Sequence, residues 1–213
     1  MGNSGGYTMN EGYRQILNSI ASSDPTPGGG SVAALCLAHA HSLAAMVARL
    51  TMSSEKWSAG HEIASEIIEQ SDVAISDSLG LADRDADAFD SVMAAYRLPK
   101  NEEFQESRKQ AIREATIGAA IVPLETMVCA SELLNNLLEL SSECNSNALT
   151  DLGSSAELAH TAARMAEMNV RINTGYLEGD DIDEIENSAN ETMGRCDSTL
   201  EDVKASYMSR LGW

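Results

Sequence analysis

The sequence is poor in basic residues, in aromatic residues and in long apolar runs. Its 213 residues include 14 Lys and Arg against 33 Asp and Glu, a formal charge of −19. Binding to nucleic acid or to an anionic membrane surface needs a basic face, so this deficit argues against both kinds of partner. No run of about 18 uninterrupted apolar residues occurs, so a membrane-spanning helix is not expected.

Recognisable metal and nucleotide motifs are also missing. The four cysteines form no C-x-x-C pair or zinc spacing, which predicts free thiols in a cytoplasmic protein. Glu157 and His160 supply half of the Glu-x-x-His pattern of di-iron bundles, but no second copy occurs. His39 and His41 are two residues apart and point to different sides of a helix. We therefore expect no metal site.

Apolar residues recur at helical spacing along nearly the whole chain, and no window alternates as a strand would. The predicted fold class is all-α, an up-and-down bundle of five to six long helices, with a flexible Gly-rich head at 1–10 and a single domain at 11–213. Pro123 lies inside one helix and predicts a kink or break there. Long helices in a small chain leave exposed flanks, which favours a dimer. The predicted helices are 11–20, 32–52, 56–96, 102–141, 151–176 and 184–208.

Asp85 is the most informative acidic residue, because it lies on an apolar helix face. That face also carries Leu81, Phe89 and Val92 at helical spacing. A carboxylate facing a core or interface loses hydration, which raises its pKa and suits general acid–base chemistry or a cationic ligand. The alternative is a buried Asp that braces another helix. Its acidic neighbours occupy a different face and read as solvated charge: Asp83, Asp87 and Asp90.

The run Gly28, Gly29, Gly30 and Ser31 is the second candidate feature. Glycines before a helix expose backbone N–H groups at the positive end of the helix dipole, and Ser31 is a good N-cap. Such a turn can hold an anion or let a flat ligand approach the backbone. No Lys follows, as in a Walker loop, and no strand precedes, as in a dinucleotide fold. A plain interhelical turn is the alternative.

Arg97 and Lys100 are cations at the end of the helix that carries Asp85. In a chain this acidic, they are candidates to bind a carboxylate tail. The alternative is favourable placement of cations at a helix C-terminus, which is common. Arg171 is a further candidate with the same ambiguity.

Short motifs spread in order along nearly the whole chain resemble the cyclodeaminase/cyclohydrolase family. This is the folate-active helical domain that occurs in formiminotransferase–cyclodeaminases and alone in methenyltetrahydrofolate cyclohydrolases. Each motif is short, and their order along the chain makes them specific. The matching segments are 26–34, 46–51, 83–89, 95–100, 122–124, 145–151 and 169–173.

The resemblance implies a dimeric helical bundle with a folate groove at the dimer interface. It also implies that Asp85 is the proton donor and acceptor, and that no metal or redox cofactor is needed because a tetrahydrofolate derivative is the substrate. Pterin and positioning contacts are expected from the glycine turn. Further substrate contacts are expected at Asn145, Asp151, Asn169 and Asn173, and Arg97, Lys100 and Arg171 are expected to bind the glutamate tail or orient Asp85.

Two reactions fit this resemblance. Hydrolysis of 5,10-methenyltetrahydrofolate to 10-formyltetrahydrofolate is favoured, because the chain shows no formiminotransferase half. Cyclisation of 5-formiminotetrahydrofolate with loss of ammonia is the alternative. A non-catalytic folate-binding or structural bundle is a third hypothesis, which retention of Asp85 and the glycine turn argues against.

Overall fold

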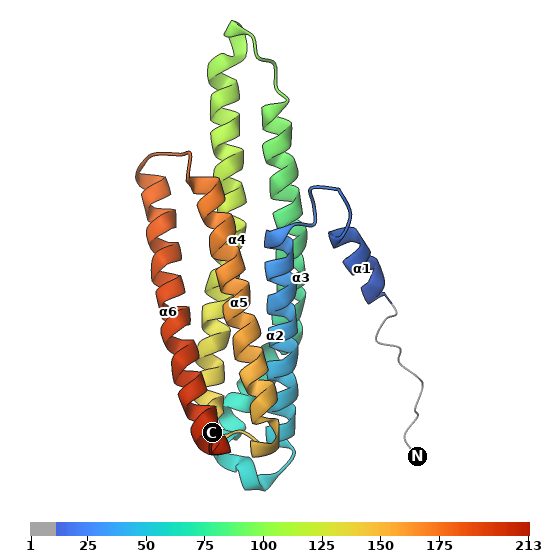
Figure 1. The fold of residues 1–213 in the computed structure, drawn as a ribbon, viewed down its shortest axis with the longest axis vertical. Helices are drawn as coiled ribbons and strands as arrows, with labels where there is room; N and C mark the ends of the chain where they lie inside the picture. The colour runs from blue at the N-terminus through green and yellow to red at the C-terminus, as the bar shows by residue number, and fades with distance from the viewer. Residues whose placement is uncertain (1–11) are drawn as a thin grey trace.

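Five long helices lie side by side along the long axis of the computed structural model, which describes residues 12–213 (Figure 1). The predicted head at 1–10 lies outside these residues. A short helix α1 lies beside the bundle, and no strand occurs within the described range, so the all-α up-and-down prediction is confirmed. The helices are α1 (Tyr13–Ile20), α2 (Gly29–Met52), α3 (His61–Tyr96), α4 (Gln105–Glu143), α5 (Leu149–Thr174) and α6 (Asp180–Leu211), with 3-10 turns η1 (Glu55–Gly60), η2 (Glu102–Phe104) and η3 (Ser146–Ala148).

Consecutive long helices alternate in direction, and the α3–α4 hairpin extends past the N-terminal end of α2 (Figure 1). Helix α2 packs on α3 and α5, while α4 packs on α3, α5 and α6. Helix α2 therefore begins partway along the bundle, beside the middle of α3. This offset leaves room above its first turn, between α3, α4 and α5.

The centre of the bundle is built from small side chains. Helix α2 is rich in alanine, and its core-facing alanines are buried: Ala33, Ala34, Ala38, Ala40, Ala44, Ala45 and Ala48. Small side chains let neighbouring helices approach closely, and the hydroxyl of Ser155 on α5 donates to the Ala40 carbonyl at 2.7 Å. One continuous apolar cluster links α2, α3, α4, α5 and α6. The prediction that 11–213 is a single domain stays a prediction.

One local prediction is wrong, and of the kink or break predicted at Pro123 the break does not occur. Ser31 is not the N-cap of α2, because the helix begins at Gly29 with Gly28 in the N-cap position and Ser31 inside the first turn. Pro123 does not break its helix, since α4 is continuous from Gln105 to Glu143 and Pro123 is buried within it. Packing on three neighbouring helices outweighs the one backbone hydrogen bond that proline removes.

Two stretches are long and apolar enough to cross a membrane by length and composition, Gly29–Met52 and Glu102–Glu143, and the most apolar 18-residue window of each has a mean hydropathy of 1.6. In both, 56% of the most apolar window is buried inside the bundle. Core helices of globular proteins meet the same criterion, so this is weak evidence for a membrane.

Candidate active site

A cavity of about 330 Å³ opens where α2 begins. It lies between the segment that precedes α2 and the facing sides of α3, α4 and α5. Among the described residues that line it, Asp85 is the only ionisable one. The lining residues are Pro25, Thr26, Gly28, Gly29, Gly30, Asp85, Phe89, Val92, Ala119, Asn169, Ile172 and Asn173.

Asp85 lies half-buried on the inward side of α3, as the helical periodicity predicted. Oδ2 of Asp85 accepts a hydrogen bond from the Ser31 hydroxyl at 3.0 Å. Burial raises the pKa of Asp85 above its ordinary value, while the hydroxyl and backbone N–H of Ser31 act in the opposite direction. Burial is the larger of these effects, so the pKa of Asp85 is raised overall. A carboxyl group with a raised pKa is suited to exchange a proton. Asp83, Asp87 and Asp90 are exposed, as expected.

The glycine turn lets α2 start directly against this carboxylate. A Cβ atom on Gly30 would overlap the Asp85 carboxyl group, so only glycine fits there without moving Asp85. Gly29 lies close to the amide of Asn169, and Gly28 packs on the Pro25 carbonyl. The three predicted glycines therefore line the cavity. Ser31 does not: it is buried, and its hydroxyl is directed to Asp85, so the predicted direct contact with a ligand is replaced by a contact with the carboxylate.

Asn169 and Asn173, one turn apart on α5, line the cavity with fixed amide orientations. The Asn173 amide nitrogen donates to the carbonyls of Ala119 and Asn169, both at 2.9 Å. The Asn169 amide nitrogen donates to the Met165 carbonyl at 2.8 Å. Because only the NH₂ end of an amide can donate to a carbonyl, each Oδ1 remains as an acceptor. Within residues 12–213, neither Oδ1 has a hydrogen-bond partner or is a buried orphan.

Several apolar residues of the cavity were not among the predicted site residues. Phe89 and Val92 were placed on the inward face of α3, and Ile172 lies inside the 169–173 motif. Their presence in those two patterns was the available signal. Ala119 on α4 carried none, because its place depends on how α4 packs against α5.

Arg97 and Lys100 lie beyond the cavity. Twelve helical residues separate Asp85 from Arg97, a rise of about 18 Å. Both basic side chains are exposed at the tip of the α3–α4 hairpin (Figure 1). Their role in binding a ligand tail stays a prediction.

Asn145 and Asp151 lie at the opposite end of the bundle. The Asn145 backbone N–H donates to the Thr51 hydroxyl at 3.0 Å, and its side chain donates to the Leu50 carbonyl at 3.2 Å. Twenty residues of α2, about 30 Å, separate Thr51 from Ser31. Asp151 is in the first turn of α5, at that same end. Neither residue can touch a ligand held at Asp85 of the same chain, so their contact with a substrate in a groove at the dimer interface stays a prediction.

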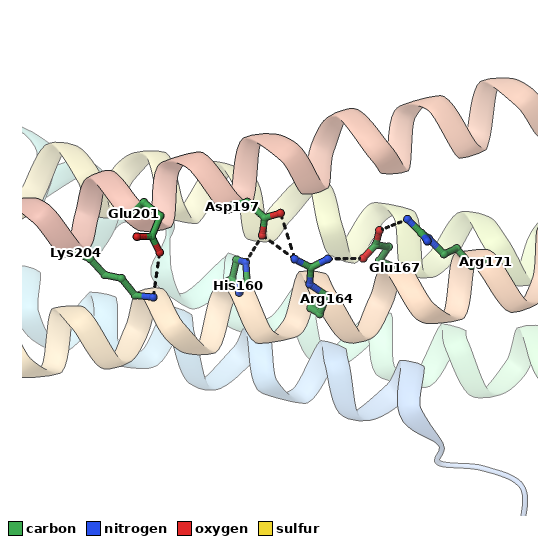
Figure 2. Close-up of polar contacts among 7 residues, drawn as sticks. All are labelled: His160, Arg164, Glu167, Arg171, Asp197, Glu201 and Lys204. Atoms are coloured by element: carbon green, nitrogen blue, oxygen red, sulfur yellow. Dashed lines mark hydrogen bonds and ion pairs between the residues drawn. The ribbon is translucent and has the colours of Figure 1, made fainter.

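Arg171 points away from the cavity, toward α6. Figure 2 shows it as the end of a chain of polar contacts between α5 and α6. Arg171 donates to Glu167 at 2.7 Å and to Asn190 at 3.3 Å. The prediction that Arg171 orients Asp85 is therefore wrong for this chain, because the turn of α5 that carries Asn169 toward the cavity carries Arg171 to the other side.

The same series of polar contacts includes His160, which forms half of a Glu-x-x-His pattern together with Glu157. His160 lies 2.7 Å from Asp197, which also binds Arg164 (Figure 2). Glu157 instead pairs with Lys204 at 3.1 Å. In the described part of the chain, no group of three or more His, Cys, Asp or Glu side chains is arranged to hold a metal ion.

A helical bundle whose cavity holds a single ionisable side chain belongs to the class of proteins that bind a small molecule and can exchange a proton with it. The family follows from comparison with known proteins. The family model for formiminotransferase-cyclodeaminase matches residues 12–192. The chain belongs to this family, and the relatives it matches are named as enzymes.

Three relatives represent the family. The methenyltetrahydrofolate cyclohydrolase of Methylorubrum extorquens is 34% identical over 79% of this chain and 82% of its own. The formimidoyltransferase-cyclodeaminase of Rattus norvegicus is 30% identical over 96% of this chain, which spans 37% of that longer protein. The crystal structure of a formiminotetrahydrofolate cyclodeaminase from Thermotoga maritima superposes with a TM-score of 0.84 at 25% identity, covering 94% of this chain and 96% of that one.

Proposed function

We propose that this protein is a cytoplasmic methenyltetrahydrofolate cyclohydrolase, which hydrolyses 5,10-methenyltetrahydrofolate to 10-formyltetrahydrofolate. The observation that carries the proposal is Asp85, half-buried in the cavity where α2 begins. The cyclohydrolase of Methylorubrum extorquens, matched over most of both chains, supports this reaction.

The chemistry of the substrate fits a lone carboxylate. The methenyl bridge is an amidinium cation, and an ionised Asp85 stabilises positive charge placed beside it. No basic side chain lines the cavity to oppose this attraction. The cavity is otherwise apolar on the side of Phe89, Val92 and Ile172, which suits a flat aromatic ring system.

Proton transfer by Asp85 completes the reaction. A water molecule forms a bond to the bridge carbon and gives one proton to the Asp85 carboxylate, which leaves a neutral carbinolamine. The bond from the bridge carbon to N5 then breaks, N5 takes the proton from Asp85, and the hydroxyl becomes the formyl carbonyl as its proton leaves. The sum is one water consumed and one proton released. This proposal requires neither a metal ion nor a redox cofactor.

The two asparagines supply recognition. Their free Oδ1 atoms accept hydrogen bonds, and a reduced pterin carries several N–H donors along its edge. These two acceptors favour a ring that presents N–H groups toward them. We therefore assign pterin binding to Asn169 and Asn173.

A second candidate reaction has its own support. The formimidoyltransferase-cyclodeaminases and the Thermotoga maritima structure carry the cyclodeaminase name. In that reaction N10 attacks the formimino carbon, ammonia leaves, and the same methenyl cation is formed beside the same carboxylate. We rank it second because those relatives are more distant and the chain spans 37% of the rat protein.

We also propose that the protein is a homodimer whose interface adjoins the cavity, and that it binds neither nucleic acid nor a membrane. Ile172 lines the cavity, yet 62% of its surface is exposed. Met168, one turn earlier on α5, is also exposed. Exposed apolar side chains that continue from a cavity onto the surface favour burial by a second chain. The net charge of −19 favours a partner other than a polyanion.

The test follows the absorbance of 5,10-methenyltetrahydrofolate after the protein is added, against a buffer control. We expect faster hydrolysis with the native chain and a loss of about 100-fold or more in Asp85→Asn, since general acid–base catalysis contributes at least that much. Asp87→Asn is the matched control: it removes an exposed carboxylate from the same helix and is expected to be fully active. Full activity of Asp85→Asn would overturn the assignment. Ammonia release from 5-formiminotetrahydrofolate without cyclohydrolase activity would favour the second reaction.

A further inference from the structure

Asp85 depends on one side chain for its polar environment. Within residues 12–213, the Ser31 hydroxyl is the only side-chain group that hydrogen-bonds to it, and no Lys, Arg or His pairs with it. Ser31 itself is 1% exposed, so water cannot readily replace its hydroxyl. The state of the carboxylate is thus coupled to one buried residue, Ser31, through its hydroxyl and its backbone N–H.

The hydroxyl of Ser31 donates to a carboxylate on another helix, unlike the buried hydroxyls of Thr51 and Ser78. Thr51 and Ser78 donate to the carbonyl four residues earlier in their own helices, at 2.9 and 2.7 Å. Ser31 instead donates across to α3. A hydroxyl has one hydrogen, and a carboxylate can only accept, so the direction of this hydrogen bond is settled.

The two carboxylate oxygens of Asp85 are consequently unequal. Oδ2 is bound by Ser31, whereas Oδ1 lies closest to the place where a side chain on Gly30 would be. Gly30 lines the cavity and Ser31 does not. Oδ1 is therefore the oxygen that a ligand above the glycine turn can reach.

We infer that Ser31 is a positioning residue for the reaction: its hydroxyl holds Oδ2 of Asp85 and leaves Oδ1 to exchange the proton with the substrate. The inference rests on the proposed function for its kinetic consequence, but the coupling between Ser31 and Asp85 does not. A hydrogen bond to the charged form favours that form, so Ser31 also keeps Asp85 ionised and ready to accept the proton from water.

Ser31→Ala tests this role against a matched variant, Ser78→Ala. Ser78 is also a buried serine, lies on the helix that carries Asp85, and bonds only to its own backbone. In Ser31→Ala we expect the acid limb of the pH profile of kcat/KM to move to higher pH, because burial then raises the pKa of Asp85 without opposition from the hydroxyl. We also expect kcat near neutral pH to fall about 10-fold, less than the roughly 100-fold that loss of the acid–base group itself would cost, because Asp85 is still present. Ser31→Thr, which keeps the hydroxyl, should restore both.

A titration of the ligand-free protein separates this inference from the proposed function. The carboxyl ¹³C signal of Asp85 is identified by its loss in Asp85→Asn and followed with pH in the native chain and both alanine variants. We expect a higher pKa for Asp85 in Ser31→Ala and no change in Ser78→Ala. An Asp85 pKa that is unchanged in Ser31→Ala overturns the inference, whatever substrate the protein uses. A raised pKa together with an absence of cyclohydrolase activity keeps the coupling and rejects the reaction.

Discussion

A hydrogen atom is the largest side chain that position 30 can carry beside Asp85. A Cβ atom there would overlap the carboxyl group itself rather than the flexible end of a long side chain. The first turn of α2 is packed between helices and cannot retreat without disturbing buried alanines. The carboxylate must therefore move, and with it the group that exchanges the proton.

Gly30→Ala is expected to fold but to lose about 100-fold or more of its activity, the effect of displacing a catalytic group by about 1 Å. Activity is measured with 5,10-methenyltetrahydrofolate and folding by circular dichroism. Gly194→Ala serves as the control. Gly194 is exposed to solvent in the middle of α6, and nothing lies within 4 Å of a Cβ added there. That variant should remain active and gain about 0.5–1 kcal/mol of stability. An active Gly30→Ala protein would contradict the close approach of α2 to Asp85.

At the scale of elements, α5 and α6 are joined by charged side chains rather than by apolar packing alone. Glu167 on α5 is 5% exposed and accepts from Arg164 at 3.0 Å and from Arg171 at 2.7 Å (Figure 2). Arg164 continues the chain to Asp197 on α6. The pKa of Asp197 is lowered, first by the hydrogen bond from His160 and then by the Arg164 charge. These polar contacts hold the Arg171 side chain on the α6 side of α5, away from the cavity.

Glu167→Ala should destabilise the protein by about 1–2 kcal/mol, since it removes two charge-assisted hydrogen bonds while both arginines can return to water. Urea unfolding measures the change. Glu201→Ala offers the comparison: its carboxylate is 75% exposed in a pair with Lys204 on α6, and its loss should alter stability by no more than about 0.5 kcal/mol. Equal effects of the two substitutions would mean that the desolvation of Glu167 cancels its ion pairs.

Helical periodicity predicted these elements well and their ends less well. The spacing of apolar residues over long windows predicts helices α2 to α6, and a few residues that depart from the spacing do not change that prediction. The start of α2 depends on whether Gly29 and Gly30 adopt helical geometry, and both do. At Gly30, the Asp85 carboxylate leaves room only for glycine. Pro123 lies within a helix that neighbours support on several sides. Tertiary packing decides whether such positions are helical, and the local sequence pattern does not predict that packing.

At the scale of the whole molecule, the cavity combines residues from four segments, and the sequence could place only some of them. The sequence predicts Asp85 because a charged residue on the apolar face of a helix can be recognised from that helix alone. Asn145 shares a family motif but lies about 30 Å away along α2, since α5 begins at the opposite end from the cavity. The side of α5 that Arg171 occupies depends on α6. These relations depend on how helices meet, which a single-chain pattern does not contain.

The surface of one chain leaves apolar side chains uncovered next to the cavity. Met168 and Ile172, one turn apart on α5, are 59% and 62% exposed, and Tyr176, just beyond the end of that helix, is 89% exposed. On α1, the apolar stripe that includes Ile16 and Leu17 is also exposed, and no residue of that helix is buried. Such uncovered apolar stripes on two helices favour a second copy of the chain as the partner that covers them.

Met168→Glu is therefore expected to convert a homodimer into a monomer and to reduce activity, because a charge would be placed in the apolar interface beside Ile172. Sedimentation equilibrium distinguishes a species of twice 22.7 kDa from a single chain. Val73→Glu is the matched control: Val73 is 62% exposed on α3 but does not line the Asp85 cavity, so that variant should keep both dimer and activity. A native chain that sediments as an active monomer would reject the dimer. A Met168→Glu protein that remains dimeric would place the interface on another face, away from the carboxylate that the proposed reaction requires.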